Sequence, residues 1–101
     1  MTGTTTKPKF NCGTVLSTPG ALEAFEKNHQ TPFEFLQRHL NGDWGDLDDE
    51  DKQANELALV DGSRLLSAYH LKDGTKVWCI TEAENEGGHR EAHTFLLPSE
   101  Y

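Results

Sequence analysis

The spacing of apolar residues changes once along this chain, just after Gly62, and the change constrains the fold more than any other feature. Before it, apolar residues recur at helical spacing; after it they alternate with polar residues, as in a β-strand. A chain of 101 residues supports one domain with one core. We therefore predict a single α+β domain over residues 10–101, with two or three short N-terminal helices packed on a three- to four-stranded antiparallel β-meander.

Two helix starts carry the same signal, an N-cap Thr followed by Pro at the first helical position: Thr18-Pro19 and Thr31-Pro32. Glu34 completes a capping box at the second start. The expected helices run from Pro19 to about Asn28, from Pro32 to Leu40 and from about Asp48 or Asp49 to Asp61, after a short strand at residues 14–17. Their predicted buried residues are Ala21, Leu22 and Phe25, then Phe33, Leu36 and Leu40, then Ala54, Leu57 and Ala58.

The meander is predicted from strands at residues 64–71, 76–82 and 92–97, the last of them ended by Pro98. A two-residue Asp73-Gly74 turn would place Tyr69 opposite Trp78 and Ala68 opposite Cys79. Both faces of this hairpin would then be apolar, one of them carrying Tyr69 and Trp78. Short helices cover one face of a sheet more easily than two. The second face is expected either to be wrapped by the third helix and the N-terminal segment or to meet a partner.

Composition excludes several classes of function. The 17 acidic and 9 basic residues give a net charge of −8, which disfavours direct binding to nucleic acid and to an anionic membrane. No apolar run approaches membrane-spanning length and no signal-peptide core follows Met1, so we expect a cytoplasmic protein. Residues 1–9 are polar and Thr-rich and are predicted to be a disordered tail. Cys12 and Cys79 are expected to be reduced, buried thiols.

Six carboxylates fall within the nine residues from Asp43 to Asp51. An EF-hand is excluded because Leu57 occupies the place of the bidentate Glu counted from Asp46. The favoured interpretation is a solvated loop plus acids that complement the dipole of the third helix. A magnesium site at Asp43 and Asp46 and an acidic mimic of nucleic acid are the alternatives. Trp44, between these acids, is either a loop anchor or a recognition residue.

No cofactor or metal site is predicted. His89 and His93 have a His-x3-His spacing, but it falls at a strand start, where it does not aim two imidazoles at one ion. His70 and Cys79 would lie near each other without a third ligand. No segment matches a nucleophile elbow, a phosphate-binding loop or a dinucleotide fingerprint.

One enzymatic alternative remains, an RNase-like toxin. Small metal-independent RNases and RelE-type toxins also place helices before an antiparallel sheet, with catalytic side chains on its concave face. This analogy rests on the fold alone, and the excess of acids argues against the basic cleft of such enzymes. The residues that could supply the catalytic set are Arg64, Ser67, Tyr69, His70, Thr81 and Thr94.

A set of segments from about Phe10 onward forms a pattern shared with a known family: residues 18–24, 42–47, 62–69, 77–83 and 94–101. In these segments the chain resembles a family of small bacterial proteins carried on plasmids and integrative elements. Relatives carry labels such as plasmid-related protein or type I restriction endonuclease subunit M. The second label implies an adenine methyltransferase, whose Asn-Pro-Pro-Tyr-type motif is absent from this sequence. Residues 84–93 depart from the family pattern and are expected to form a peripheral loop.

The resemblance implies a mobile-element accessory role, in regulation or against host defence. Our leading hypothesis is a non-enzymatic protein-binding module that docks a partner protein or a second copy. Its expected contact residues are Asp43, Trp44 and Asp46 in the loop and Tyr69 and Trp78 on the sheet. The alternatives are the RNase-like toxin and an acidic, anti-restriction mimic of nucleic acid.

Overall fold

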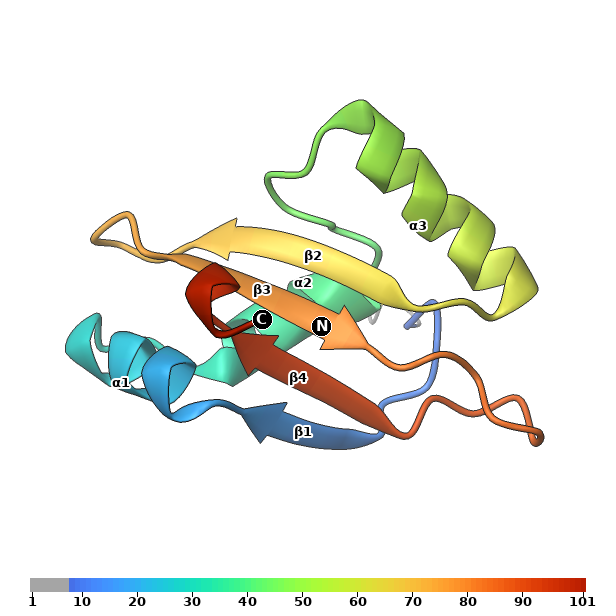
Figure 1. Cartoon of the computed structure of the whole chain (residues 1–101), viewed down its shortest axis with the longest axis horizontal. Coiled ribbons are helices and arrows are strands. Elements are labelled where there is room, and N and C mark those ends of the chain that lie inside the picture. Colours follow the sequence, from blue (N-terminus) through green and yellow to red (C-terminus); the bar gives the residue numbers. More distant parts are fainter. Residues whose placement is uncertain (1–7) are drawn as a thin grey trace, which may run out of the picture.

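A four-stranded mixed sheet with strand order β1-β4-β3-β2 organises the computed structural model, which describes residues 8–101 (Figure 1). The elements are β1 (Thr14–Ser17), α1 (Pro19–Lys27), α2 (Pro32–Leu40), α3 (Asp49–Asp61), β2 (Leu65–His70), β3 (Lys76–Thr81), β4 (Ala92–Leu96) and a short 3-10 turn, η1 (Pro98–Glu100). The α+β class is confirmed. The short strand predicted at residues 14–17 forms as β1, ahead of the helices. The prediction of a purely antiparallel meander after N-terminal helices is wrong, because β1 joins the same sheet and runs parallel to β4. The predicted disordered tail lies outside the described residues except for Pro8 and Lys9, and the Lys9 N–H donates to the Leu40 carbonyl (2.8 Å).

Two of the three predicted helix starts are capped as their sequences indicate. The Thr18 hydroxyl accepts from the Ala21 N–H (3.2 Å) and the Asp48 carboxylate from the Asp51 N–H (2.8 Å). The capping box predicted at the start of α2 does not form, because the Thr31 side chain makes no cap bond and Glu34 accepts from Gln30 instead (2.9 Å). The register of α2 on the sheet also differs from the prediction. Its buried residues are Phe35, Leu36, His39 and Leu40, while Phe33 is 63% exposed.

The β2–β3 hairpin closes with a three-residue loop instead of the predicted two-residue turn. Leu71 donates to the Thr75 carbonyl (2.8 Å) and Gly74 donates to the Leu71 carbonyl (2.9 Å). Gly74 has a φ of +90°, which fits the class of loops in which a left-handed Gly forms a bulge. This extra residue shifts the predicted register by one, so Tyr69 pairs with Val77 and Ala68 pairs with Trp78.

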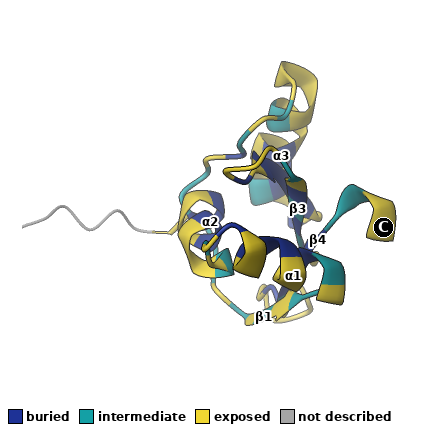
Figure 2. Ribbon diagram, turned by 90° about the vertical axis from the view of Figure 1, so that its left-hand side faces the viewer, coloured by how far each residue is buried: buried dark blue, intermediate teal, exposed yellow. Residues whose placement is uncertain are grey.

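A shift of one residue exchanges the faces on which side chains lie. Tyr69 therefore shares a face with Val77 and Cys79, and Trp78 lies on the other face with Ala68 and Leu96. Helices α1 and α2 cover the first face, where the main core is built from Ala21, Ala24, Phe25, Phe35, Leu36, Leu40, Tyr69, Leu71, Val77, Cys79 and Phe95. We call this the covered face, and the opposite side, over which η1 lies, the open face (Figure 2).

The outer edge of β2 is covered by backbone and side-chain groups. The Asn55 amide from α3 both donates to the Leu66 carbonyl (2.6 Å) and accepts from the Leu66 N–H (3.0 Å). Further along, Ala68 donates to the Trp44 carbonyl (3.1 Å) and accepts from the Asp46 N–H (2.7 Å). Gly45 lets this loop approach, since a Cβ there would lie 2.0 Å from the Ala68 carbonyl oxygen. The edge is thus closed to further strands.

Residues 84–93 are not wholly peripheral, because Arg90 at their end is 1% exposed. Its guanidinium donates to the carbonyls of Ala58 (3.0 Å), Ser63 (2.6 Å) and Glu82 (3.0 Å). The Ala58 carbonyl belongs to the last turn of α3, where a cation complements the helix dipole. Arg90 therefore fastens the end of α3 to the sheet.

The two cysteines differ from the prediction in one respect. Both thiols are free, and Cys79 is buried, which raises its pKa. Cys12, however, is exposed. Within residues 8–101, no helix is both long and apolar enough to cross a membrane.

Candidate functional site

A chain of buried polar groups runs under the covered face, and His39 of α2 is its centre. The His39 ring contacts the Ser67 hydroxyl through Nδ1 (2.5 Å) and the Thr81 hydroxyl through Nε2 (2.7 Å). Thr81 also contacts Nδ1 of His93 (2.8 Å), whose Nε2 accepts from the Gly13 N–H (2.8 Å). The four side chains are all 0% exposed, so this chain ties α2, β2, β3, β4 and the segment before β1 together.

The Gly13 N–H determines where the protons of this chain lie, because a backbone amide can only donate. Nε2 of His93 must accept, so its proton is on Nδ1 and is donated to the Thr81 oxygen. The Thr81 hydroxyl can then donate to Nε2 of His39, which leaves Nδ1 of His39 to donate to Ser67. The pattern is complete only when both imidazoles are neutral.

The surroundings of both histidines also favour the neutral form of the ring. Burial lowers the pKa of His39 to about 3, and the nearby His93 and Arg90 add to the effect. Burial also lowers the pKa of His93. The two histidines are therefore uncharged at neutral pH. Sequence reasoning missed His39, although its spacing of three or four residues from Phe35 and Leu36 would have placed it on the buried side of α2.

The contact between Ser67 and His39 has the form of a nucleophile and its base, but it is closed to substrates. Both residues are 0% exposed, and the rings of Phe10 and Trp44 pack edge-on against His39 at 5.3 and 5.6 Å. A catalytic nucleophile must reach a substrate and an oxyanion donor. This arrangement can stabilise the fold but cannot perform acyl transfer as it stands.

The set of residues considered for an RNase-like site is divided between two environments. Ser67, Tyr69 and Thr81 are buried on the covered face. Arg64 and His70 are exposed, and Nδ1 of His70 contacts Asp46 (2.7 Å). The structure therefore does not bring the predicted catalytic set together.

Of the predicted docking residues, the two aromatic ones nearest the acidic loop are interior. Trp44 is 4% exposed, stacks on Phe10 and donates from Nε1 to Glu56 (2.8 Å), so it anchors the loop. Tyr69 is 0% exposed and its hydroxyl donates to the Asp43 carbonyl (2.6 Å). A docking face shared by Tyr69 and Trp78 does not exist, because the shifted register separates them.

The acidic stretch is used mainly for local structure. Asp43 pairs with Arg38 (2.7 Å), Asp46 with His70 (2.7 Å), and Asp48 caps α3. The Arg38 guanidinium lowers the pKa of Asp43. No group of three potential metal ligands occurs anywhere in the part of the chain that the structure describes.

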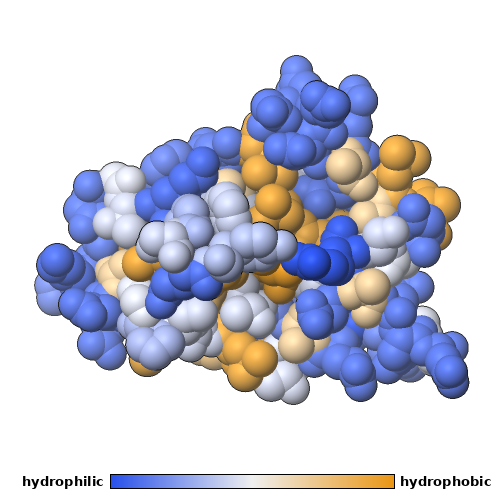
Figure 3. Space-filling model, in the orientation of Figure 1, coloured by the Kyte–Doolittle hydropathy of each residue, from blue (hydrophilic) through white to orange (hydrophobic). Residues whose placement is uncertain are grey.

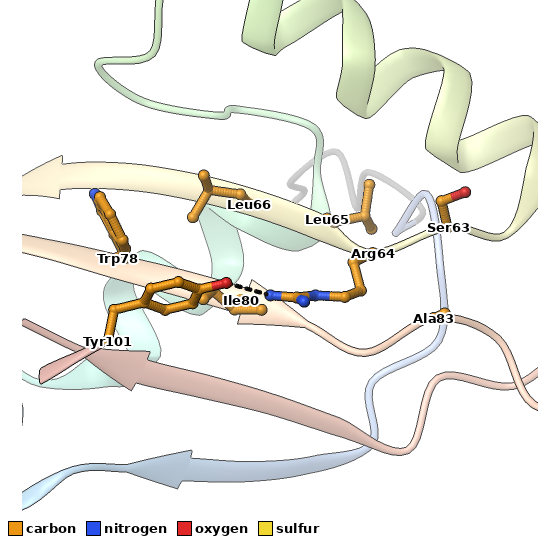
Figure 4. Close-up of a pocket in the computed structure, with 8 residues that line it drawn as sticks. All are labelled: Ser63, Arg64, Leu65, Leu66, Trp78, Ile80, Ala83 and Tyr101. Carbon is orange, nitrogen blue, oxygen red and sulfur yellow. Dashed lines mark hydrogen bonds between the residues drawn. The ribbon is translucent and has the colours of Figure 1, made fainter. Parts of the chain in front are cut away.

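The open face carries a hollow of about 730 Å³ (Figure 4). Its lining residues are Ser63, Arg64, Leu65, Leu66, Trp78, Ile80, Ala83 and Tyr101. Trp78, Leu66 and Ile80 point outward from neighbouring strands because they alternate with core residues. The ring of Tyr101 lies edge-on to Trp78 at 5.7 Å. Figure 3 shows apolar surface between α3 and η1, where this hollow lies.

Among the residues that the structure describes, Arg64 is the one cationic side chain that lines the hollow. Its Nη2 donates to the Tyr101 hydroxyl (3.4 Å), and this bond raises the pKa of Arg64 further. Considering residues 8–101, no carboxylate lies within 4.0 Å of Arg64, whereas Arg38 and Arg90 each have one at or within that distance. Glu82 attracts Arg64 at longer range without contacting it. A guanidinium with no carboxylate in contact, in a chain with almost twice as many acids as bases, can accept an anionic group from outside.

No family model, curated protein or solved structure matches this chain. The function of the chain is therefore inferred from its own residues.

Proposed function

We propose that this protein is a non-enzymatic binding module that holds a segment of a partner protein in the open-face hollow. The bound segment has a bulky apolar side chain beside a carboxylate. The observation that carries the proposal is the hollow itself, in which an apolar floor adjoins a guanidinium with no carboxylate within ion-pair distance.

The apolar part of the hollow suits a side chain as anchor. Trp78, Leu66 and Ile80 are only partly buried, so an occupant would remove further apolar surface from water. Tryptophan is among the residues that most often dominate binding energy at protein interfaces. Its edge-on contact with Tyr101 leaves the ring supported on one side and accessible on the other.

The polar part of the hollow selects for an anion. The Arg64 guanidinium has a planar fork that matches a carboxylate in two-point contact, and its position beside apolar side chains strengthens that contact. The net charge of −8 favours a partner that is neutral or basic as a whole. The carboxylate is then a local feature of the segment, such as an acidic side chain or a chain terminus.

The mobile-element setting remains a prediction from the resemblance, and it would make this module an accessory protein of a plasmid or integrative element. The two alternatives have less support from the geometry. An RNase-like site lacks an assembled catalytic set, since Ser67, Tyr69 and Thr81 are buried. A nucleic-acid mimic needs unpaired acids in a regular array, whereas Asp43 pairs with Arg38, Asp46 contacts the His70 ring and Asp48 caps α3.

Selection of a displayed peptide library with the purified protein tests the proposal. We expect enriched peptides that combine a bulky apolar residue with an adjacent carboxylate. Trp78→Ala should abolish retention of these peptides, and Arg64→Ala should weaken it by about tenfold, the effect of ~1.4 kcal/mol. Phe33→Ala is the matched control, because Phe33 is an exposed aromatic residue on α2, away from the open face.

Two results would count against the proposal. Equal retention by wild type and Trp78→Ala would place binding elsewhere on the molecule. Enrichment of peptides without a carboxylate, bound equally by Arg64→Ala, would leave the hollow as a site but remove the anionic part of its specificity.

A further inference from the structure

The two edges of the sheet differ in how they end. Asn55 and the loop around Gly45 cover the β2 edge. The β1 edge, at the other side of the sheet, has no element alongside it in the described part of the molecule (Figure 1). β1 also contains no charged residue and no Pro, two of the common devices by which proteins block an exposed edge.

The backbone of β1 shows which of its groups point outward. Thr14 donates to the Glu91 carbonyl and Thr18 to the Phe95 carbonyl, both at 2.9 Å, so these residues face β4. Backbone groups alternate along a strand, so Leu16 also faces β4 while Val15 and Ser17 face away. Among residues 8–101, no hydrogen bond uses the N–H of Val15 or Ser17.

The neighbours of these two residues offer no further donors. Gly13 lies two residues before Val15, at a position of the same alternation, but its N–H already donates to the His93 ring (2.8 Å). Pro19, two residues after Ser17, has no N–H to donate. The edge therefore presents two donors and their carbonyls, at Val15 and Ser17, separated by one residue.

We propose that this edge pairs with the β1 edge of a second copy. The two strands run antiparallel, and the two-fold axis passes between the two copies of Leu16. Val15 then lies opposite Ser17 of the second copy, and each such pair exchanges both of its N–H···O bonds. A register two residues away in either direction would have to use the committed Gly13 N–H or the missing Pro19 N–H. The edge is thus complementary to itself in one register.

The side chains agree with that register. Leu16 is 48% exposed and lies on the open face, in register with Thr94 of β4. In the proposed pair the two Leu16 side chains face each other across the axis as a non-hydrogen-bonded pair, the arrangement in which opposite side chains are closest. Pairing therefore buries one of the few large exposed apolar residues of the chain.

The axis stands perpendicular to the sheet, so both open faces lie on the same side of the dimer. Two hollows would then face the same partner and could bind it with avidity. The pairing depends only on the β1 edge and does not require the proposed function. An interface of one short strand pair is small and belongs to the weak, transient class.

Cysteine cross-linking tests both the pairing and its register. In a Cys12→Ser background, Leu16→Cys would place two Cβ atoms ~4.5–5.5 Å apart across the axis, close to the geometry of a disulfide. Thr14→Cys is the matched control, exposed on the same face, but its two copies would be separated by about four residues of strand, or ~13 Å. Under mild oxidation, we expect Leu16→Cys to form covalent dimer at least about tenfold faster than Thr14→Cys.

Sedimentation equilibrium provides a second measurement on the unmodified chain. Wild type should show concentration-dependent dimer at up to about 1 mM, as expected of a weak interface. Leu16→Asp should be monomeric because it places like charges opposite each other, while Thr14→Asp should dimerise as wild type does. Equal cross-linking of the two cysteine variants, or a wild type that stays monomeric at every concentration, would overturn the proposal.

Discussion

The two faces of the sheet use their polar groups in opposite ways. On the covered face, the hydroxyls and imidazoles around His39 satisfy one another, and all are sealed from water. On the open face, the guanidinium of Arg64 donates to the Tyr101 phenol and adjoins an apolar hollow, with no carboxylate of residues 8–101 within 4.0 Å. The face richest in residues that could perform chemistry is therefore the one that cannot reach a substrate. Changes on the covered face should affect stability, and changes on the open face should affect binding.

His39→Ala should have the largest effect on stability. It leaves the hydroxyls of Ser67 and Thr81 buried with a lost partner and opens a cavity beneath α2, so we expect a loss of about 3–5 kcal/mol. Urea denaturation of the purified protein measures this change. His70→Ala is the control, because His70 is an exposed surface residue, and it should cost less than about 0.5 kcal/mol. Similar losses for both variants would contradict the comparison.

Acid should destabilise the protein through the same group. The folded state holds the pKa of His39 at about 3, below the 6.5 of an unfolded histidine, so the unfolded state binds more protons at intermediate pH. The contribution of His39 to the free energy of unfolding is then fully present above about pH 6.5, and it is lost as the pH falls towards 3. Between about pH 6.5 and 5 we expect a loss of roughly 2 kcal/mol, in a range where carboxylates contribute little.

Urea denaturation at several pH values measures this slope. His39→Gln removes the titrating imidazole while keeping an amide that can bond to the hydroxyls, so the slope should flatten in that variant. A slope that His39→Gln leaves unchanged would assign the acid sensitivity to other groups.

Local signals in the sequence predicted most elements of the fold but not how they face one another. Thr18 caps α1 as expected, and α3 begins where the sequence placed it, with Asp48 as its cap, because capping depends on residues within one turn. The rotation of α2 depends on the sheet beneath it, so the predicted stripe through Phe33 was wrong and His39 was missed. The parallel contact of β1 with β4 joins residues about 80 positions apart, and no local pattern encodes it.

The predicted docking face, shared by Tyr69 and Trp78, does not form because of the loop between β2 and β3. Asp73-Gly74 suggested a two-residue turn, but Gly74 closes a three-residue loop. A single residue in the loop decides which side chains share a face, so Tyr69 and Trp78 were assigned together and lie apart. Trp78, which was named from the sequence, lines the hollow, and its neighbours Arg64 and Tyr101 come together there only because the chain end returns over the sheet.

Adjacent residues of β3 offer a direct comparison of the two faces. Val77 is 0% exposed on the covered face, while the larger Trp78 is only partly buried on the open face. Val77→Ala should therefore cost about 2–3 kcal/mol of folding free energy, and Trp78→Ala only about 1 kcal/mol. Chemical denaturation of the two variants in parallel measures the difference. A larger loss for Trp78→Ala would mean that the open face is part of the core and not a binding surface.

Tyr101→Ala should have the smallest effect on stability and is the sharpest probe of the hollow. Tyr101 is 73% exposed, and its ring contacts the Trp78 ring and the Arg64 guanidinium, so its removal should change stability by less than about 0.5 kcal/mol. It should nevertheless uncover Trp78. Trp44 is 4% exposed and stays shielded, so increased quenching of tryptophan fluorescence by iodide would report on Trp78. Because Arg64 loses its hydrogen bond to the Tyr101 hydroxyl in the same variant, binding of carboxylate-bearing peptides should persist or strengthen. Loss of that binding would instead make the Tyr101 ring a wall of the site that the occupant needs.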